Sequence, residues 1–260
     1  LVQMLKEHVA NVPGAWLTPC QCSAYHKSTA FHHYIDLLER VVLKFERHER
    51  PRDRFLKVEG LVRQYGMDLN ITLPSLAAMM SVPPEVGYTP LDDLAKQKRA
   101  IIESYTHILK ERSKKQPLML VVEDIQWADP SSMDLLNEVM EVVTDHRLLV
   151  LFTARPDFAS PWLEHPQMKH ITLQRLDADQ VRTICLRVAH GKKLPEEVIE
   201  QIIARTDGVP LFVEELTKMV MESGLLTESG ESYVLSGPLP ALAIPTTLQD
   251  SLMARLDRLN

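Results

Sequence analysis

Residues 118–130 read Leu-Met-Leu-Val-Val-Glu-Asp-Ile-Gln-Trp-Ala-Asp-Pro, an apolar run that ends on two adjacent carboxylates. The apolar residues do not alternate with polar ones, which is typical of a central parallel strand covered on both faces by helices. Ligands of open α/β sheets bind beyond the carboxyl ends of such strands. We therefore predict that Glu123 and Asp124 lie at a ligand site, where acids hold a magnesium ion and the water that attacks a nucleotide phosphate.

The residues after this run predict a helix and a second buried strand. Asp129 can cap a helix that has Pro130 at its first position. The next apolar run, residues 148–153, is followed by Ala-Arg-Pro, so Arg155 is predicted to emerge at the same sheet edge. A guanidinium there can bind a γ-phosphate through paired hydrogen bonds. The alternative is that the acids only begin a solvated loop and that Asp129 only caps its helix.

The composition is that of an ordinary globular protein with one large or two small domains. The 260 residues are 45% hydrophobic and 25% charged, with a formal net charge of -6. Because lysine and arginine are spread along the chain, direct nucleic-acid binding is not expected. No run approaches the roughly eighteen apolar residues of a membrane span, and three cysteines provide no disulfide framework. We predict a cytoplasmic protein without membrane contact, and a helical pattern that begins at Leu1 suggests an excised fragment.

Strands and helices alternate along the first two thirds of the chain. Two more strands are predicted, at residues 15–22 and 169–173, which makes four. Helices are predicted at residues 1–9, 31–45, 55–65, 73–80 and, starting from Asp92 or Asp93, through Arg112 with Leu94 facing inward. The last third is predicted to contain three short helices closed by glycines, a hairpin at residues 225–235 and a capped helix at residues 244–259.

One cluster of metal-ligand side chains near residue 20 does not have the spacing of a zinc site. Cys20 and Cys22 are separated by one residue, whereas zinc sites use two to four, and no second pair follows. The cysteines, with His26, His32 and His33 after them, are therefore interpreted as strand-end and loop residues.

Three stretches in sequence order carry a resemblance to a known family: residues 118–130, 151–156 and 207–216. Together they resemble the signal-transduction ATPases with numerous domains, over essentially the whole chain and most weakly over residues 46–91. The likeness is closest to the AAA-type ATPase segments of bacterial proteins that join a class III adenylate or guanylate cyclase domain to tetratricopeptide repeats. Similar segments occur in LuxR-type transcription regulators.

The resemblance implies roles for five residues. Glu123 and Asp124 match the family's second nucleotide motif, in which one acid binds magnesium through water and the other polarises the attacking water. Their order, Glu before Asp, leaves the two roles unassigned. Arg155 matches the sensor that contacts the γ-phosphate. Gly208 and Pro210 match a Gly-x-Pro turn whose proline packs on the adenine, and the alternative is that they only end one helix and start the next.

The resemblance also implies a fold. Residues 1–174 are expected to form a P-loop NTPase core, a parallel sheet sandwiched by helices without its first strand and phosphate loop. Residues 175–229 are expected to form a small helical lid, and residues 230–260 a linker hairpin and the first helix of a winged-helix module. No Gly-x-x-x-x-Gly-Lys-Ser/Thr motif occurs in these 260 residues. In the family this loop directly precedes the helix that here starts at Leu1, so we expect residues 1–260 alone not to bind ATP measurably.

The function implied by the resemblance is that of a regulatory module that binds ATP and Mg²⁺, hydrolyses ATP slowly and responds to the ATP or ADP state. Its partners would be an attached output domain, such as a cyclase or a regulator, and a repeat domain, with nucleotide-dependent self-association as a further interaction. The alternatives are a non-catalytic scaffold for protein–protein contacts and the ATPase module of a LuxR-type transcription regulator.

Overall fold

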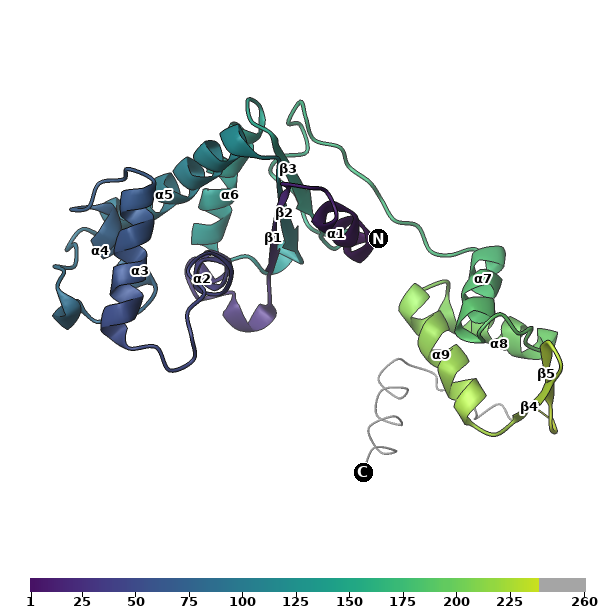
Figure 1. Cartoon of the computed structure of the whole chain (residues 1–260). Coiled ribbons are helices and arrows are strands. Elements are labelled where there is room, and N and C mark those ends of the chain that lie inside the picture. Colours follow the sequence, from purple (N-terminus) through teal and green to yellow (C-terminus); the bar gives the residue numbers. More distant parts are fainter. Residues whose placement is uncertain (239–260) are drawn as a thin grey trace. The chain divides into compact units, whose positions relative to one another are not determined.

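A computed structural model describes residues 1–238 and divides the chain into two compact units, of which the second starts at Ile171. Each unit has its own hydrophobic core. Figure 1 labels their helices and strands in chain order. The predicted helix at residues 244–259 lies outside the described residues. None of the helices described is both long and apolar enough to cross a bilayer.

The first unit is organised around a sheet of three parallel strands. Its order is β1 (Trp16–Gln21), β2 (Leu118–Glu123) and β3 (Leu148–Phe152). Trp16 pairs with Leu118, and Leu118 pairs with Leu148. Parallel pairing brings the carboxyl ends of the strands to one edge of the sheet. The prediction that the run at residue 118 is a central, buried parallel strand is confirmed.

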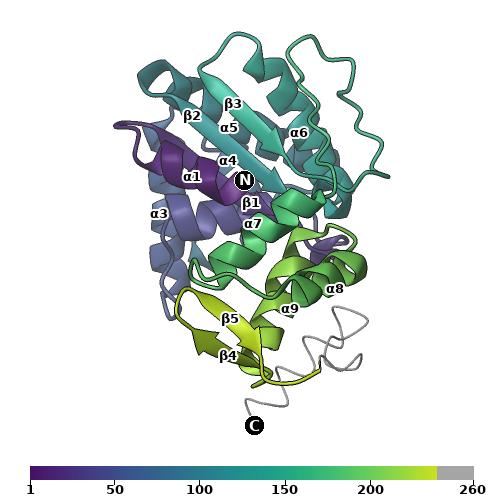
Figure 2. The ribbon, with the colours of Figure 1, turned by 90° about the vertical axis from the view of Figure 1, so that its right-hand side faces the viewer.

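Helices lie on both faces of this sheet. On one face, α2 (His32–Asp36), α5 (Leu94–Lys115) and α6 (Pro130–Val143) contact the strands. The opposite face carries α1 (Val2–Ala10), as the two ribbon views agree (Figures 1 and 2). Side chains alternate between the faces along a strand. Leu120 and Val122 of β2 therefore enter the core beside α5 and α6, whereas Met119 and Val121 point to the α1 side.

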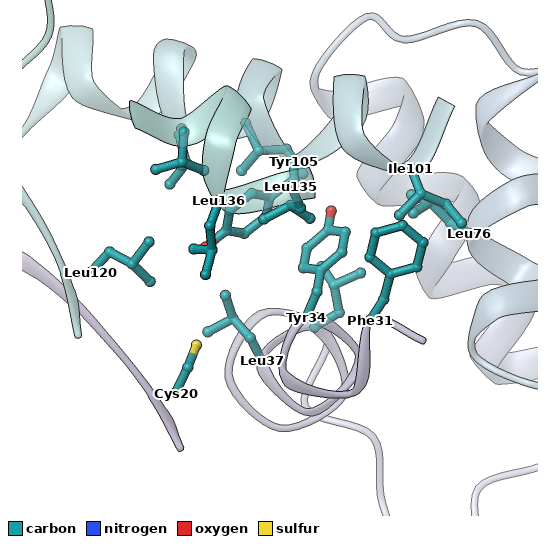
Figure 3. Packing of buried hydrophobic residues seen from close by; sticks show 14 of the residues in the cluster. Cys20, Phe31, Tyr34, Leu37, Leu76, Ile101, Tyr105, Leu120, Leu135 and Leu136 are labelled. Carbon is teal, nitrogen blue, oxygen red and sulfur yellow. The ribbon is translucent and has the colours of Figure 1, made fainter. Parts of the chain in front are cut away.

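The main core forms where α2, α5 and α6 meet the sheet. Cys20 of β1 and Leu120 of β2 face Leu37 and the two tyrosines of the helices (Figure 3). The rings of Tyr34 and Tyr105 meet edge to face, with 4.4 Å between their centroids. Such aromatic pairs stabilise a core by about 0.5–1.5 kcal/mol beyond the area they bury. These buried side chains form a packed layer against the sheet whose carboxyl edge carries the acids.

The predicted helix over residues 31–45 is shorter and less regular than expected. It starts after Phe31, and α2 continues into a π-helical turn at Leu37–Val42. Leu37 and Leu38, which are adjacent in sequence, are both fully buried there. The π-helical turn is closed by a hydrogen bond between residues five apart, from the Leu43 N–H to the Leu38 carbonyl at 2.8 Å.

The long connection from β1 to β2 is helical. α3 (Pro51–Gln64) packs on α4 (Thr72–Met79), and α4 packs on α5. Asp93 caps α5 by accepting a hydrogen bond from the Lys96 N–H at 3.0 Å, as one of the two predicted starts requires. The inward orientation predicted for Leu94 is wrong: this side chain is 75% exposed, since it lies in the first turn, before the helix reaches its neighbours.

The predicted strand at residues 169–173 is also wrong. These residues have no regular secondary structure, and Ile171 and Leu173 are mostly exposed. Within residues 1–238 the sheet ends at β3, whose Leu149 is exposed and whose outer side has no partner strand. Alternating apolar residues form a strand only when they pair with a neighbouring strand, and residues 169–173 pair with none of the described strands.

The second unit is mainly helical. It contains α7 (Ala178–Val188), α8 (Glu196–Thr206), α9 (Pro210–Glu222) and a hairpin of β4 (Leu226–Ser229) and β5 (Ser232–Leu235). Asp177 and Gln180 form a capping box at the start of α7. The hairpin is joined to the helices through Lys193, whose N–H donates to the Glu231 carbonyl and whose carbonyl accepts from the Tyr233 N–H.

Candidate functional site

The acidic pair lies where β2 reaches the carboxyl edge of the sheet. Glu123 is the last residue of β2 and Asp124 is the next residue, and both are half-buried. Glu123 follows the alternation of Met119 and Val121 and so points to the α1 face. There its carboxylate forms an ion pair and hydrogen bond with Lys6 of α1. α1 buries none of its residues fully, so this pair is a principal contact of that helix.

Asp124 has a left-handed backbone conformation, with φ 57° and ψ 44°. Few residues other than glycine adopt this region, and aspartate and asparagine do so most readily. Two hydrogen bonds with Thr153, just beyond β3, hold the turn in place. The Asp124 N–H donates to the Thr153 hydroxyl at 2.9 Å, and the Ile125 N–H donates to the Thr153 carbonyl at 3.0 Å. The end of β3 therefore sets the direction in which the Asp124 carboxylate leaves β2.

Gln126 connects Asp124 to the loop that carries Arg155. The Gln126 side-chain amide donates to Asp124 Oδ1 at 3.3 Å, and its carbonyl oxygen accepts from the Arg155 N–H at 3.2 Å. Glu123, Asp124 and Arg155 thus lie together at one sheet edge. Sequence reasoning missed Gln126 and Thr153, although Thr153 is a polar residue directly after β3 and Gln126 lies three residues after the end of β2.

The Arg155 side chain is exposed and lies over the indole of Trp127, with 5.4 Å between the guanidinium carbon and the ring centroid. Lys27, from the loop after β1, places its Nζ 5.8 Å from the same centroid. Both distances are within the range of cation–π attraction. Neither Lys27 nor Trp127 was identified from the sequence, because their contact joins segments a hundred residues apart.

Gly208 and Pro210 lie in the second unit, between α8 and α9. Gly208 has φ +67°, and a Cβ atom on it would lie 2.3 Å from the Leu176 carbonyl oxygen. The Leu176 N–H donates to the Gly208 carbonyl at 2.8 Å, and Pro210 is the first residue of α9. Only glycine fits this close approach. The structural role of the turn is therefore clear, while a contact with adenine stays a prediction.

A small interior cavity lies beside the sheet but does not suit a nucleotide. Its volume of about 20 Å³ has room for about one water molecule. The lining is mostly apolar and includes Cys20 and His33. Burial lowers the pKa of His33.

The acidic pair fits a magnesium ion under one condition. Mg²⁺ is usually held by one or two carboxylates together with waters and the phosphates of a substrate. In residues 1–238 no group of three or more His, Cys, Asp and Glu side chains is arranged to hold a metal by itself. The pair therefore suits Mg²⁺ that arrives with a phosphate-bearing ligand. Asp124 is the more available acid, because Lys6 neutralises Glu123.

A family model described as an AAA ATPase domain matches residues 1–151, which include β1, α5 and the acidic pair. The chain belongs to the AAA ATPase domain family. Nucleotide binding is what this family membership implies. The chain is also similar to an uncharacterized protein of Rhizobium meliloti (strain 1021), with 32% identity over 110 residues. That match covers 41% of the chain and 11% of the relative, so the chain spans only a small part of the relative's length.

Proposed function

We propose that this AAA ATPase domain binds ATP with Mg²⁺, hydrolyses it slowly and acts as a regulatory switch in a multidomain signalling protein of the cytoplasm. The observation that carries the proposal is the hydrogen-bonded chain from Asp124 through Gln126 to Arg155 at the carboxyl edge of the sheet. It fixes the backbone of Arg155, whose guanidinium suits a terminal phosphate, beside an acid suited to a cation or a water molecule. A sheet edge of this kind is where α/β proteins bind ligands.

Each residue of the site has a distinct part in the proposed reaction. Asp124 orients the attacking water and accepts its proton, while the Gln126 side chain keeps the Asp124 carboxylate in the required orientation. Arg155 donates paired hydrogen bonds to the γ-phosphate. Glu123 adds negative charge beside the cation site, balanced in part by Lys6. Bound Mg²⁺ supplies neutralisation of the phosphate charge.

The proposal assigns a role to the rest of the chain. In this proposal, residues 1–174 are the ATPase core and residues 175–229 are a helical lid, and the linker and next module assigned to residues 230–260 fall largely outside the described residues. Gly208 and Pro210 lie at the turn that would meet the adenine. The nucleotide state would pass through the lid to an attached output domain, such as an adenylate or guanylate cyclase, and to a repeat domain.

Asp124→Asn in the full-length protein tests this proposal. Since a neutral amide cannot accept the proton of water, we expect ATP turnover to fall by about 100-fold or more while ATP affinity changes little. Asp145→Asn is the matched control, because Asp145 is exposed in the loop after α6. Unchanged turnover in Asp124→Asn would remove the catalytic role of the pair. Absence of ATP binding by the unaltered protein would favour the non-catalytic scaffold.

A further inference from the structure

Two cations from separate loops meet on the indole of Trp127. Lys27 follows a short 3-10 helix after β1, Trp127 ends the turn after the acidic pair, and Arg155 follows β3. Their cationic groups lie 5.8 Å and 5.4 Å from the same ring centroid. Both side chains are exposed, and Trp127 is half-buried. Lys27, Trp127 and Arg155 are called the indole cluster below.

All three loops of the indole cluster are tied to the acidic turn. The Trp127 N–H donates to the Asp124 carbonyl at 2.9 Å, and the Arg155 N–H donates to Gln126 at 3.2 Å. Asp129, which caps α6, also accepts from the Phe31 N–H at 3.3 Å and so holds the loop that contains Lys27. These hydrogen bonds therefore hold the loops that carry Lys27 and Arg155 close to the turn at Asp124.

Within the first unit, the two cations have no carboxylate partner. Within the first unit, residues 1–170, no acidic side chain lies within ion-pair distance of Lys27 or Arg155. Glu123 is paired with Lys6, and Asp129 is buried and bonded to the start of α6. Two like charges on one ring repel each other, and an anion between them removes that repulsion.

We propose that the indole cluster is an anion site that binds a phosphate group of the nucleotide, with Lys27 as a second cationic ligand beside Arg155. This inference rests on the proposed function and adds to it a binding residue from the loop after β1. The guanidinium presents a planar fork to phosphate oxygens, whereas the ammonium acts as a point charge on a flexible stem. Trp127 keeps both cations at the sheet edge, one turn from Asp124, where a metal-bound polyphosphate would carry its negative charge.

Sodium tripolyphosphate is the probe, because it carries the phosphate chain without the base or ribose. The full-length protein is titrated while tryptophan emission is recorded, and the signal of Trp127 is isolated by comparison with Trp127→Phe. We expect a saturable change in Trp127 emission. Lys27→Met and Arg155→Met should each weaken tripolyphosphate binding roughly fivefold or more, and Lys27→Arg should restore it. Lys115→Met is the control, since Lys115 is exposed at the end of α5.

Two results would overturn the inference. The first is that Lys27→Met binds tripolyphosphate with the affinity of the unaltered protein and shows the same change in Trp127 emission. The other is no tripolyphosphate binding by the unaltered protein. ATP turnover, measured on the same samples, separates this inference from the proposed function. Binding through Lys27 without any ATP hydrolysis would keep the anion site and remove the ATPase reaction. Hydrolysis with an unchanged KM in Lys27→Met would keep the ATPase reaction and remove Lys27 from the site.

Discussion

The Thr153 hydroxyl, just beyond β3, accepts a hydrogen bond from the Asp124 N–H, just beyond β2, at 2.9 Å. This side chain joins the ends of two neighbouring parallel strands, beside the backbone hydrogen bond from the Ile125 N–H to the Thr153 carbonyl. It also supports the left-handed conformation of Asp124, which costs about 1–2 kcal/mol in a residue with a side chain. The orientation of the second acid therefore depends on a neighbour from another strand.

Thr153→Val tests this dependence. Valine has the shape of threonine and keeps the backbone bonds, but it leaves the Asp124 N–H without its acceptor. We expect the free energy of unfolding in urea to fall by about 1–2 kcal/mol and ATP turnover to fall with it. Thr144→Val, at an exposed position after α6, should change stability by less than about 0.5 kcal/mol. Equal free energies of unfolding for Thr153→Val and Thr144→Val would contradict a role of Thr153 in holding Asp124.

Arg155→Ala should remove the preference of the protein for ATP over ADP. The proposed partner of the guanidinium is the γ-phosphate, which ADP lacks. We expect ATP affinity to fall by about tenfold or more, as for loss of a charge-assisted pair, while ADP affinity stays the same. Calorimetric titration of the full-length protein with magnesium measures both, and Arg47→Ala, at an exposed position, serves as control. Equal weakening of ATP and ADP would indicate a structural role for Arg155.

Gly208→Ala should destabilise the second unit strongly. The new Cβ would meet the Leu176 carbonyl, and the backbone is left-handed, so we expect a loss of about 2–4 kcal/mol. Gly224→Ala is a close control, because Gly224 has φ +76° but nothing within 4 Å of a Cβ, and should lose only about 1–2 kcal/mol. Labelling of Cys185, buried in this unit, reports local opening. Similar labelling rates in the two variants would show that the contact with Leu176 is unimportant.

Stability should decrease at alkaline pH through two buried thiols. Burial raises the pKa of Cys20 and of Cys22 from 9.0 to about 12. The unfolded chain loses these protons near pH 9 while the folded chain keeps them, so the stabilisation is complete below pH 9 and is lost as the pH rises toward 12. A Cys20→Ala, Cys22→Ala double variant should show a weaker decline in urea titrations between pH 8 and pH 11. Since buried Tyr34 and Tyr105 are present in both proteins, the difference isolates the thiols.

Local signals in the sequence predicted the central strand and several helix starts of the first unit. The apolar run before Glu123 was sufficient for a central buried strand. Capping residues predicted the start of α6 at Asp129 and that of α5 at Asp92 or Asp93, of which Asp93 is the cap. Each of these depends on residues within a few positions of one another. The family match supports the same α/β architecture.

Features that depend on distant partners were not predicted. Lys6 and Glu123 form their pair across the whole unit, and Lys27 reaches Trp127 from another loop. The strand expected at residues 169–173 had a suitable pattern but no neighbour to pair with in the described residues. Pattern alone shows what a segment can form, whereas pairing and side-chain contacts across the sheet require the three-dimensional arrangement. The roles of Glu123, Asp124, Arg155, Gly208 and Pro210 stay predictions.

The pairing of β1 with β2 has a consequence for the growing polypeptide. Trp16 meets Leu118 only after α2 to α5 have been synthesised. At a synthesis rate of ~5–20 residues per second, the ribosome therefore completes β2 on the order of 5–20 s after β1, and until then β1 lacks the strand with which it pairs. The connection can fold in the meantime, because α3 packs on α4 and α4 packs on α5 through contacts close in sequence. This helical subassembly would then receive β2, and with it β1, as synthesis proceeds toward β3.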